Sequence, residues 1–366
     1  MVDLEAGPDD KSLAGDIELL PPHLRRAALQ KVRKRFPDAR AIRETIIYEE
    51  RNPFEKELPA ARAAYDNVQD VLAGVCAAER TDLKSQLPRV RAVVGQMVAS
   101  MVRNPKAMMW FSRLRETDSY TYSHLIDASV YLIAFGRHLG FPEPVLQLLG
   151  LAGLMIDIGK LRVPSEVLHH PGELTPQQFE QVKEHVRHGI DMLHESDTVP
   201  GKALEIIARH HERWDGSGYP DGLVAEAIGI FGSMAGIVDV YTAMILDRPY
   251  ARAKSTLQGL QALYSARDQL FSAALVEQFI QMVGVYPVGS LVELNTQEVG
   301  IVIQENRTRR LKPKLMLLLD ARKQPYGKPP VLDLFTDPQD PAGNPLIIAR
   351  ELEPGAYGID LRHYFQ

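Results

Sequence analysis

Two acidic residues lie inside long apolar stretches of this 366-residue chain. Asp157 ends the run VLQLLGLAGLMID, and Asp239 lies within AIGIFGSMAGIVDVYTAMIL. A carboxylate among aliphatic side chains is costly unless a cation or a metal ion compensates its charge. One such aspartate could be explained by a buried Asp–Arg pair or by a cap at a helix end. Two of them, together with histidines in helical segments, favour a shared metal site to which helices from distant parts of the chain each contribute an inward ligand.

Two of these histidines lie in segments with clear helical patterns. His124 lies in SYTYSHLIDASVYLIAFGRHLG, on the helix face that it shares with Ala128 and Tyr131. His185 lies in LTPQQFEQVKEHVRHG, which reads as one helix. The start of that helix is predicted by an N-cap, a proline at the first helical position and a capping-box partner, which are Thr175, Pro176 and Gln178. Taken alone, each histidine would be interpreted as a satisfied core or surface residue.

Residues 210–223 read HHERWDGSGYPDGL and begin with two adjacent histidines, His210 and His211. Glycines at 216, 218 and 222 permit positive φ angles and close backbone approach, and a proline at 220 fixes the turn between them. Neutral imidazole is the commonest nitrogen ligand of metals in proteins. The His-His pair alone would indicate a surface loop after a helix. The whole string indicates a binding loop beside a metal.

This string resembles the signature of the HD-GYP family of bacterial cyclic-di-GMP phosphodiesterases. The resemblance covers roughly residues 118–284 and rests on the segments YTYSH, IDIGK, PGELT, KEHVRHG, the loop itself and VDVYTAMILDRPY, which occur in the family order. It implies an all-helical HD domain that holds two or three metals, usually iron or manganese. It also implies a cyclic-di-GMP substrate, which is opened to pGpG or GMP.

The resemblance assigns roles to individual residues of this sequence. It implies that His124 and Asp239 bind one metal, that His185, His210 and His211 bind a second, and that Asp157 bridges the two. Asp157 and Lys160 are the expected catalytic residues. Contacts with the substrate are expected from Lys160, Asp215, Gly216, Gly218, Tyr219, Pro220 and Arg248, and a charged side chain among them suits a phosphodiester.

The chain departs from the family pattern at one position that matters. Ile156 stands where the family has the histidine of the His-Asp pair, and isoleucine cannot ligate a metal. We therefore expect one or two ions, iron or manganese, with the first metal weakened. Lesser departures point the same way: Thr242 stands at a common aspartate position, Gly236 at a frequent arginine position, and Ala251 at a basic one.

Three functions remain open on these residues. The first is a working cyclic-di-GMP phosphodiesterase with impaired occupancy of one metal. The second is a degenerate member that binds cyclic-di-GMP as a sensor or acts as an interaction scaffold, with its GYP loop contacting a diguanylate cyclase (GGDEF) domain. The third is another HD-type nucleotide hydrolysis. Hydrolysis of cyclic-di-GMP is the leading hypothesis.

Composition favours a cytoplasmic protein. A net charge of −5 and a pI near 6.1 give no drive toward a nucleic-acid polymer, and the single cysteine excludes an internal disulfide. We expect no transmembrane segment and no signal peptide. The fold class expected is mainly α: an HD-type helical bundle with an N-terminal helical region and a small C-terminal β subdomain. The predicted domains are 1–90 (N-terminal helical region), 91–284 (HD-GYP helical domain) and 285–366 (β-rich subdomain). In the last of these, turn residues separate short β-rich runs such as SLVELN, VGIVIQ, LMLLLD and PVLDLF.

Overall fold

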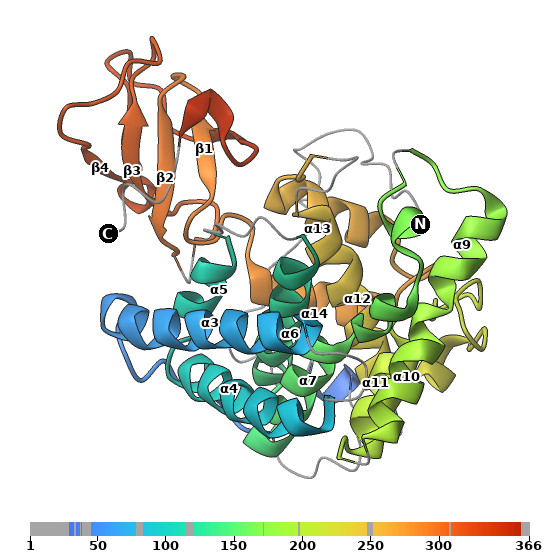
Figure 1. Cartoon of the computed structure of the whole chain (residues 1–366). Helices are drawn as coiled ribbons and strands as arrows, with labels where there is room; N and C mark the ends of the chain where they lie inside the picture. The colour runs from blue at the N-terminus through green and yellow to red at the C-terminus, as the bar shows by residue number, and fades with distance from the viewer. Residues whose placement is uncertain are drawn as a thin grey trace. The chain divides into compact units, whose positions relative to one another are not determined.

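The computed structural model describes residues 29–32, 34–36, 38, 45–77, 83–113, 120–170, 172–196, 198–246, 252–306 and 309–359. In these ranges the chain is mainly helical, with a small antiparallel sheet toward the C-terminal end, as the sequence predicts (Figure 1). The longer helices are α3 (Phe54–Ala77), α4 (Leu83–Arg103), α5 (Pro105–Arg113), α6 (Tyr120–His138), α7 (Glu143–Met155), α9 (Pro176–Lys183), α10 (His185–Glu195), α11 (Gly201–Arg209), α12 (Gly229–Met244), α13 (Thr256–Ser265) and α14 (Ala273–Val283). Shorter helical segments are η2 (Ile158–Arg162), α8 (Ser165–Leu168), η3 (Ala225–Ile228), η4 (Leu334–Thr336) and η5 (Ala356–Gly358).

The chain divides into two compact units. The larger consists of residues 26–252 and 266–279, and the smaller of 1–25, 253–265 and 280–366. Every described residue with a predicted metal-binding role lies in the larger unit. The domain boundaries expected from the sequence stay a prediction.

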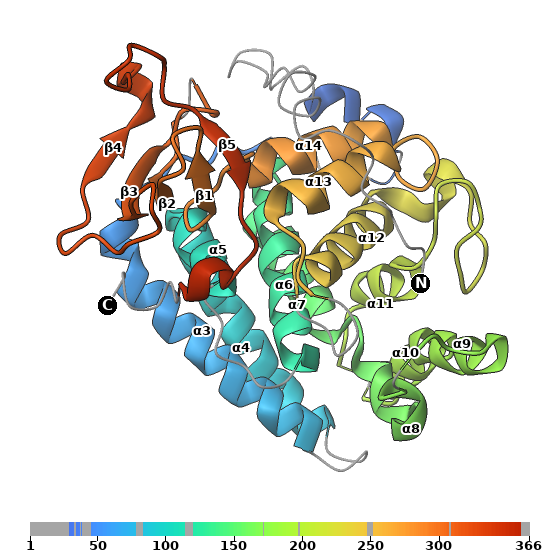
Figure 2. The same cartoon turned by 90° about the horizontal axis from the view of Figure 1, so that it is seen from above.

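Packed helix pairs build the larger unit. Helix α3 packs on α4, and α6 packs on both α7 and α12 (Figure 2). Where α6 meets α12, the fully buried rings of Tyr131 and Tyr241 lie edge to face at 5.2 Å, and Phe279 lies 5.0 Å from Tyr241. This aromatic core fixes α6 and α12, the helices that carry His124 and Asp239.

The segment HLRRAALQKVRKRF at residues 23–36 is rich in basic residues, and its described part, at 29–32 and 34–36, packs with its apolar face inward. Of its described side chains, Leu29, Val32 and Phe36 are buried, while the charged ones at 31, 34 and 35 are exposed. Arg35 pairs with Glu226 at 3.0 Å. The charges therefore form a solvated helix face.

The start of α9 is confirmed, but the single helix expected around His185 is wrong. The Thr175 hydroxyl accepts a hydrogen bond from the Gln178 backbone N–H, and the Gln178 side chain accepts one from the Thr175 N–H. The helix then ends at Lys183, and α10 begins at His185 after a break at Glu184. The break places His185 at the start of a helix.

A close backbone contact holds η2 against α10. A Cβ atom added at Gly159 would lie 1.9 Å from the carbonyl oxygen of His185 and 2.4 Å from the backbone nitrogen of Gly189. Only glycine allows this approach. It sets the turn that carries Asp157 directly against the first turn of α10.

We expect Gly159→Ala to lower the free energy of unfolding by about 3 kcal/mol, because backbone atoms must move to admit the new methyl group. Urea unfolding of the purified variant measures the effect. Gly95→Ala in α4 is the matched control: no atom lies within 4 Å of the added Cβ, so helix propensity should leave stability unchanged or raise it by up to about 1 kcal/mol. Equal stabilities for the two variants would contradict the expectation.

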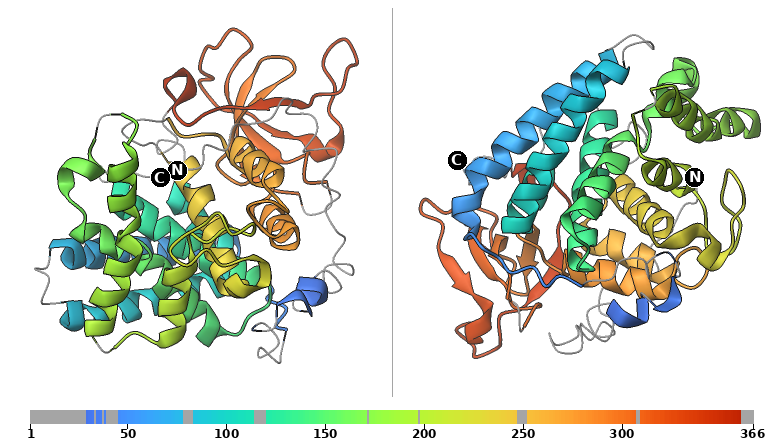
Figure 3. Two further views of the ribbon diagram at one scale, coloured as in Figure 1. Left: turned by 90° about the vertical axis from the view of Figure 1, so that its right-hand side faces the viewer. Right: turned by 90° about the horizontal axis from the view of Figure 1, so that it is seen from below.

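The sheet of the smaller unit, coloured orange to red in Figure 3, has five antiparallel strands in the order β4-β3-β2-β1-β5. The strands are β1 (Leu291–Leu294), β2 (Val299–Gln304), β3 (Lys314–Leu319), β4 (Val331–Asp333) and β5 (Ile348–Glu351). The first four coincide with the apolar runs SLVELN, VGIVIQ, LMLLLD and PVLDLF. The fifth, with the sequence IARE, lacks an apolar pattern and pairs with β1.

Two described segments are long and apolar enough to cross a bilayer on length and composition alone. They are Glu143–Arg162 and Ala225–Met244, and 67% and 72% of the 18-residue apolar window in each is buried inside the protein. Each consists of a helix and an adjoining 3-10 turn of the packed larger unit. Such burial is the ordinary pattern of core helices.

Candidate metal centre

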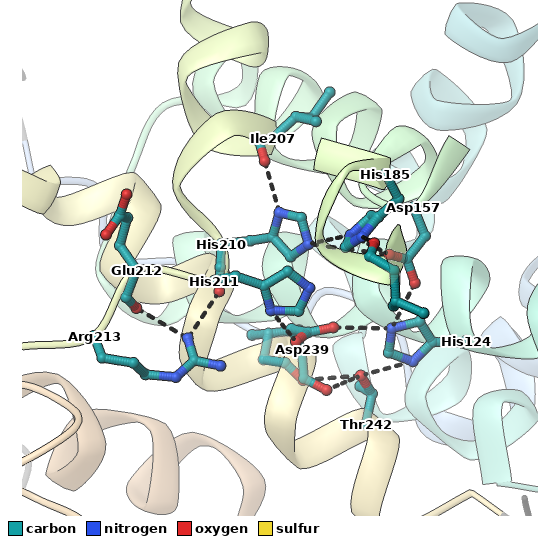
Figure 4. A network of polar contacts seen from close by, with 12 residues as sticks. His124, Asp157, His185, Ile207, His210, His211, Glu212, Arg213, Asp239 and Thr242 are labelled. Atoms are coloured by element: carbon teal, nitrogen blue, oxygen red, sulfur yellow. Dashed lines mark hydrogen bonds and ion pairs between the residues drawn. The ribbon is translucent and has the colours of Figure 1, made fainter. Parts of the chain in front are cut away.

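Six predicted ligand residues come together from five places in the chain (Figure 4). His124 lies in α6 and Asp239 in α12, whereas Asp157 lies in the turn after α7. The remaining three are at helix ends: His185 begins α10, His210 caps the end of α11, and His211 follows it. Their candidate ligand atoms form two groups that share Asp157, each with all atoms within 4.8 Å of one another: Asp157, His185, His210 and His211; and His124, Asp157 and Asp239.

Backbone carbonyls orient two of the imidazoles. The Nδ1 atom of His185 lies 2.7 Å from the carbonyl oxygen of Val182, and that of His210 lies 2.6 Å from the carbonyl oxygen of Ile207. A carbonyl only accepts hydrogen bonds, so each Nδ1 carries the proton and the neutral ring keeps its lone pair on Nε2. The two Nε2 atoms face each other at 3.4 Å. Two lone pairs that point at each other repel unless a cation lies between them.

Asp157 lies between the two groups and is buried. Its Oδ2 accepts a 2.6 Å hydrogen bond from Lys160 Nζ and lies 3.5 Å from His124 Nε2. Among the described residues, its Oδ1 accepts no hydrogen bond, although His185 Nε2 lies 3.2 Å away. Burial alone would raise the pKa of this carboxyl, but Lys160, His185 and His124 outweigh that effect and hold the pKa well below its usual value. The carboxylate is therefore charged and has one oxygen available to a cation.

In the group formed by His124, Asp157 and Asp239, the polar side chains contact one another and Thr242. His124 Nε2 lies 3.0 Å from Asp239 Oδ1. On the other side of the ring, Thr242 Oγ1 lies 3.4 Å from His124 Nδ1, and it donates to the carbonyl of Val238 at 2.8 Å. Burial would raise the pKa of Asp239, but the nearby His211 and His124 lower it far below its usual value.

These residues fit a bound divalent metal. The donor set consists of two facing imidazole lone pairs, a third imidazole and a buried carboxylate oxygen that accepts no hydrogen bond from the described residues. Such nitrogen and oxygen donors suit first-row transition metals. Orientation of histidine ligands through Nδ1–H bonds to carbonyls is the usual arrangement around such metals.

Burial keeps two of the imidazoles neutral. It lowers the pKa of His210 to about 4, and it lowers the pKa of His211 well below the ordinary value of about 6.5. The nearby His185 adds to the shift for His210, and His210 does so for His211. Neutral rings are the form that binds metal.

This shift predicts how the metal-free protein responds to acid. Between pH 6.5 and about 4 the unfolded chain binds a proton at His210 that the folded chain does not, so stability falls as pH falls. Each such imidazole contributes up to about 1.4 kcal/mol per pH unit. The two buried carboxylates have lowered folded pKa values and add to this loss only below about pH 5, where the unfolded chain begins to protonate them. Urea unfolding of chelator-treated protein at pH 6.5, 5.5 and 4.5 measures the slope.

His210→Gln should reduce this slope, and His194→Gln should leave it unchanged, because His194 is exposed on α10. A wild-type stability that is flat across the window would contradict the expectation.

The loop of the signature string folds back on the histidine pair. The Tyr219 ring stacks on His211 with centroids 4.6 Å apart, and the Tyr219 N–H donates to the His211 carbonyl at 3.1 Å. Gly216 has a φ of +82°, as the sequence suggested. Gly218 is required for a different reason: a Cβ there would lie 2.4 Å from the Arg213 nitrogen.

Other predicted substrate contacts differ in their setting. The exposed carboxylate of Asp215 accepts hydrogen bonds from the N–H and the hydroxyl of Ser217, at 2.9 and 2.6 Å. Pro220 is partly exposed beside Tyr219. Arg248 and Ala251 lie outside the described residues.

Several neighbours of the site were not singled out from the sequence. Phe179 of α9 lies edge to face with Tyr219 at 6.5 Å, and the Lys183 ammonium lies 4.8 Å from the centre of the Phe179 ring. The carbonyls of Val182 and Ile207 were also missed. A backbone acceptor carries no sequence signal, whereas Phe179 carries one, because it is an aromatic residue in the otherwise polar segment TPQQFEQ, six residues before His185.

Two protein-family models match the chain, the first over helical residues and the second over strands of the sheet. Residues 109–275 match the family model described as an HD domain, and residues 291–339 match a KOW domain associated with HD domains. The first match contains all six clustered residues, and the second contains β1 to β4.

Curated relatives and a solved structure are similar to parts of the chain. A cyclic di-GMP phosphodiesterase of Pseudomonas aeruginosa is 35% identical over 66% of this chain and 58% of its own length. The cyclic di-GMP phosphodiesterase response regulator RpfG of Xanthomonas campestris pv. campestris is 38% identical over 40% of this chain and 39% of its own length. The chain thus spans less than two thirds of either relative. A structure described as an HDG"Y"P protein from Bdellovibrio bacteriovorus matches with a TM-score of 0.52 and 15% identity, over 72% of this chain and 81% of that one, and supports the fold.

Proposed function

Because this chain is a member of the HD-GYP family, with its HD domain at residues 109–275, we propose that it is a metal-dependent phosphodiesterase that hydrolyses cyclic-di-GMP to pGpG or GMP. The observation that carries the proposal is the pair of buried imidazoles whose Nε2 atoms face each other at 3.4 Å beside Asp157 Oδ1, which accepts no hydrogen bond from the described residues. Such a donor set is unfavourable without a cation. The relatives named as cyclic di-GMP phosphodiesterases supply the substrate class.

We assign the tighter metal position to Asp157, His185, His210 and His211, with iron or manganese as the ion. The position formed by His124, Asp157 and Asp239 is the weaker one, because it offers three ligands and lies beside Ile156. A divalent metal at such a site supplies a hydroxide nucleophile at neutral pH by lowering the pKa of its bound water.

The chain's own residues would bind and orient the diester around this ion. Lys160 Nζ lies 2.6 Å from Asp157 Oδ2, and about a quarter of the Lys160 side chain is exposed. Its ammonium can therefore move to a substrate phosphate. Tyr219 offers a ring beside His211, and burial, with Asp239 and Asp157 nearby, raises its pKa, so the phenol stays a hydrogen-bond donor. The loop that carries Tyr219 is shaped by Gly216, Gly218 and Pro220. The remaining proposed substrate contacts are Asp215 and Arg248.

A second candidate is a cyclic-di-GMP sensor or scaffold without efficient turnover. One observation favours it: Ile156 is 1% exposed next to Asp157, so an aliphatic side chain occupies the place beside the weaker position. In this case the exposed part of the loop, around Asp215 and Ser217, is the proposed contact for a diguanylate cyclase domain. We place either form of the protein in the cytosol.

The two candidates separate in one experiment. Protein purified without oxygen and loaded with Fe(II) or Mn(II) is incubated with cyclic-di-GMP, and pGpG and GMP are measured by chromatography, with bound metal counted on the same sample. Multiple turnovers that disappear on chelation support the phosphodiesterase. Binding of cyclic-di-GMP by metal-loaded protein without any product would establish the sensor instead.

A further inference from the structure

Glu212 is a buried acidic residue of the signature string to which the proposed function gives no role. Its side chain follows His211 directly, is 3% exposed, and is directed away from the imidazole cluster (Figure 4). It is therefore not placed to bind the metal. A buried carboxylate needs compensation, and here it comes from the chain further on.

Both oxygens of this carboxylate accept backbone hydrogen bonds from the GYP loop. Oε1 accepts from the Asp221 N–H and Oε2 from the Leu223 N–H, each at 2.8 Å. These bonds join residue 212 to positions on the far side of the loop tip. Gly218 then approaches so closely that an added Cβ would lie 2.5 Å from the Glu212 Cα. The tip is thus held against the turn that carries the histidine pair.

The three imidazoles of the larger ligand group are not oriented in the same way. His185 and His210 each donate an Nδ1–H to a carbonyl. Among the described residues, no carbonyl accepts a hydrogen bond from His211; its Nδ1 lies 3.6 Å from Asp239 Oδ2, and one ring face is covered by Tyr219 at 4.6 Å. The orientation of His211 therefore depends on where the loop holds Tyr219.

We propose that Glu212 is a positioning residue for the metal centre: its carboxylate holds the loop so that Tyr219 keeps the His211 imidazole in its ligating orientation. The inference rests on the proposed metal centre but does not require that the protein hydrolyse cyclic-di-GMP. Arg213 supports the same turn, since its guanidinium donates to the carbonyls of His210 and Glu212 at 3.1 and 2.9 Å.

The test uses Co(II) as a probe and Glu212→Gln as the variant. The amide has nearly the same shape as the carboxylate but only one accepting oxygen, so its NH₂ must face one of the two loop N–H groups and that bond is lost. Groups that orient metal ligands typically contribute 10–100-fold to metal affinity. We expect the Co(II) dissociation constant of the full chain to rise at least about 10-fold, with a change in the visible d–d spectrum that reports the ligand geometry.

Glu226→Gln is the matched control, since it makes the same chemical change on a nearby exposed glutamate that pairs with Arg35. It should bind Co(II) as the wild type does. Urea unfolding of the metal-free proteins establishes that both variants are folded. Wild-type Co(II) affinity and spectrum in Glu212→Gln would overturn the inference.

A double-mutant cycle tests the route through Tyr219. Tyr219→Ala should weaken Co(II) binding to a similar degree, and the double variant should lose little more, because both changes act on the same ring. Losses that add fully would contradict the proposed route.

Should Glu212→Gln not fold, Gly218→Ala is the second variant, because it displaces the loop with Glu212 intact. It should raise the Co(II) dissociation constant in the same way, and wild-type affinity in Gly218→Ala would overturn the inference. Normal Co(II) binding by a wild type that makes no pGpG would contradict the proposed activity and leave this inference standing.

Discussion

Replacement of His211 with alanine is expected to remove most of the metal from the purified protein and to lower any phosphodiesterase rate at least about 100-fold. The four-donor group loses an imidazole that burial keeps neutral, and therefore able to bind metal, at neutral pH. The remaining donors are Asp157, His185 and His210. Metal content by mass spectrometry and product formation are measured on the same preparation.

His124→Ala provides the contrast. It removes one donor from the three-donor group, in which His124 already contacts Asp239 at 3.0 Å. We expect most of the bound metal to remain. The opposite ranking, with metal retained in His211→Ala and lost in His124→Ala, would show that the tighter position is the one beside Ile156.

Ile156→His should raise both metal occupancy and turnover. Ile156 is the C-cap of α7 and is buried next to Asp157, so an imidazole there would lie beside the three-donor group. Activation of water by a metal contributes several kcal/mol, and each 1.36 kcal/mol is a factor of ten, so a gain of about 10-fold or more is expected. The measurement pairs metal content with the rate of pGpG formation in the variant and the wild type.

Ile156→Leu is the control, because it changes the shape of the side chain without adding a donor. No gain in either quantity, in a variant that unfolds at the wild-type urea concentration, would mean that the missing imidazole does not limit this protein. Robust wild-type turnover that matches that of the variant would show that the histidine is dispensable here and would favour the phosphodiesterase over the sensor.

The sequence predicted elements best where side-chain pattern alone decides the structure. Strand β2 coincides with the apolar run VGIVIQ, and α9 begins at the proline that follows its N-cap. Strand β5 was missed because IARE lacks an alternating apolar pattern. It lies at the edge of the sheet, where it pairs with a single neighbouring strand. The break at Glu184 was missed because neither glycine nor proline marks it.

At the candidate site, the sequence identified the ligand types but not their arrangement. Asp157 was expected among apolar helical residues, and its burial agrees, yet it lies in a turn after α7 whose position depends on the contact between Gly159 and the backbone of α10. The protonation of His185 and His210 at Nδ1 follows from carbonyls three residues earlier, which any sequence would supply. The role of Glu212 required knowledge of where the loop returns.

The placement of the ligands at helix ends has a consequence for how an ion enters and leaves. Asp157, His185 and His210 lie where α7, α10 and α11 end or begin, and terminal turns open more readily than helix interiors. His124 and Asp239, in contrast, lie within α6 and α12. Fraying of the first turn of α10 would separate His185 from Asp157 while the aromatic core stays packed. Amide hydrogen exchange should therefore slow on metal loading around residues 157–162 and 183–187, and change little along α6 and α12.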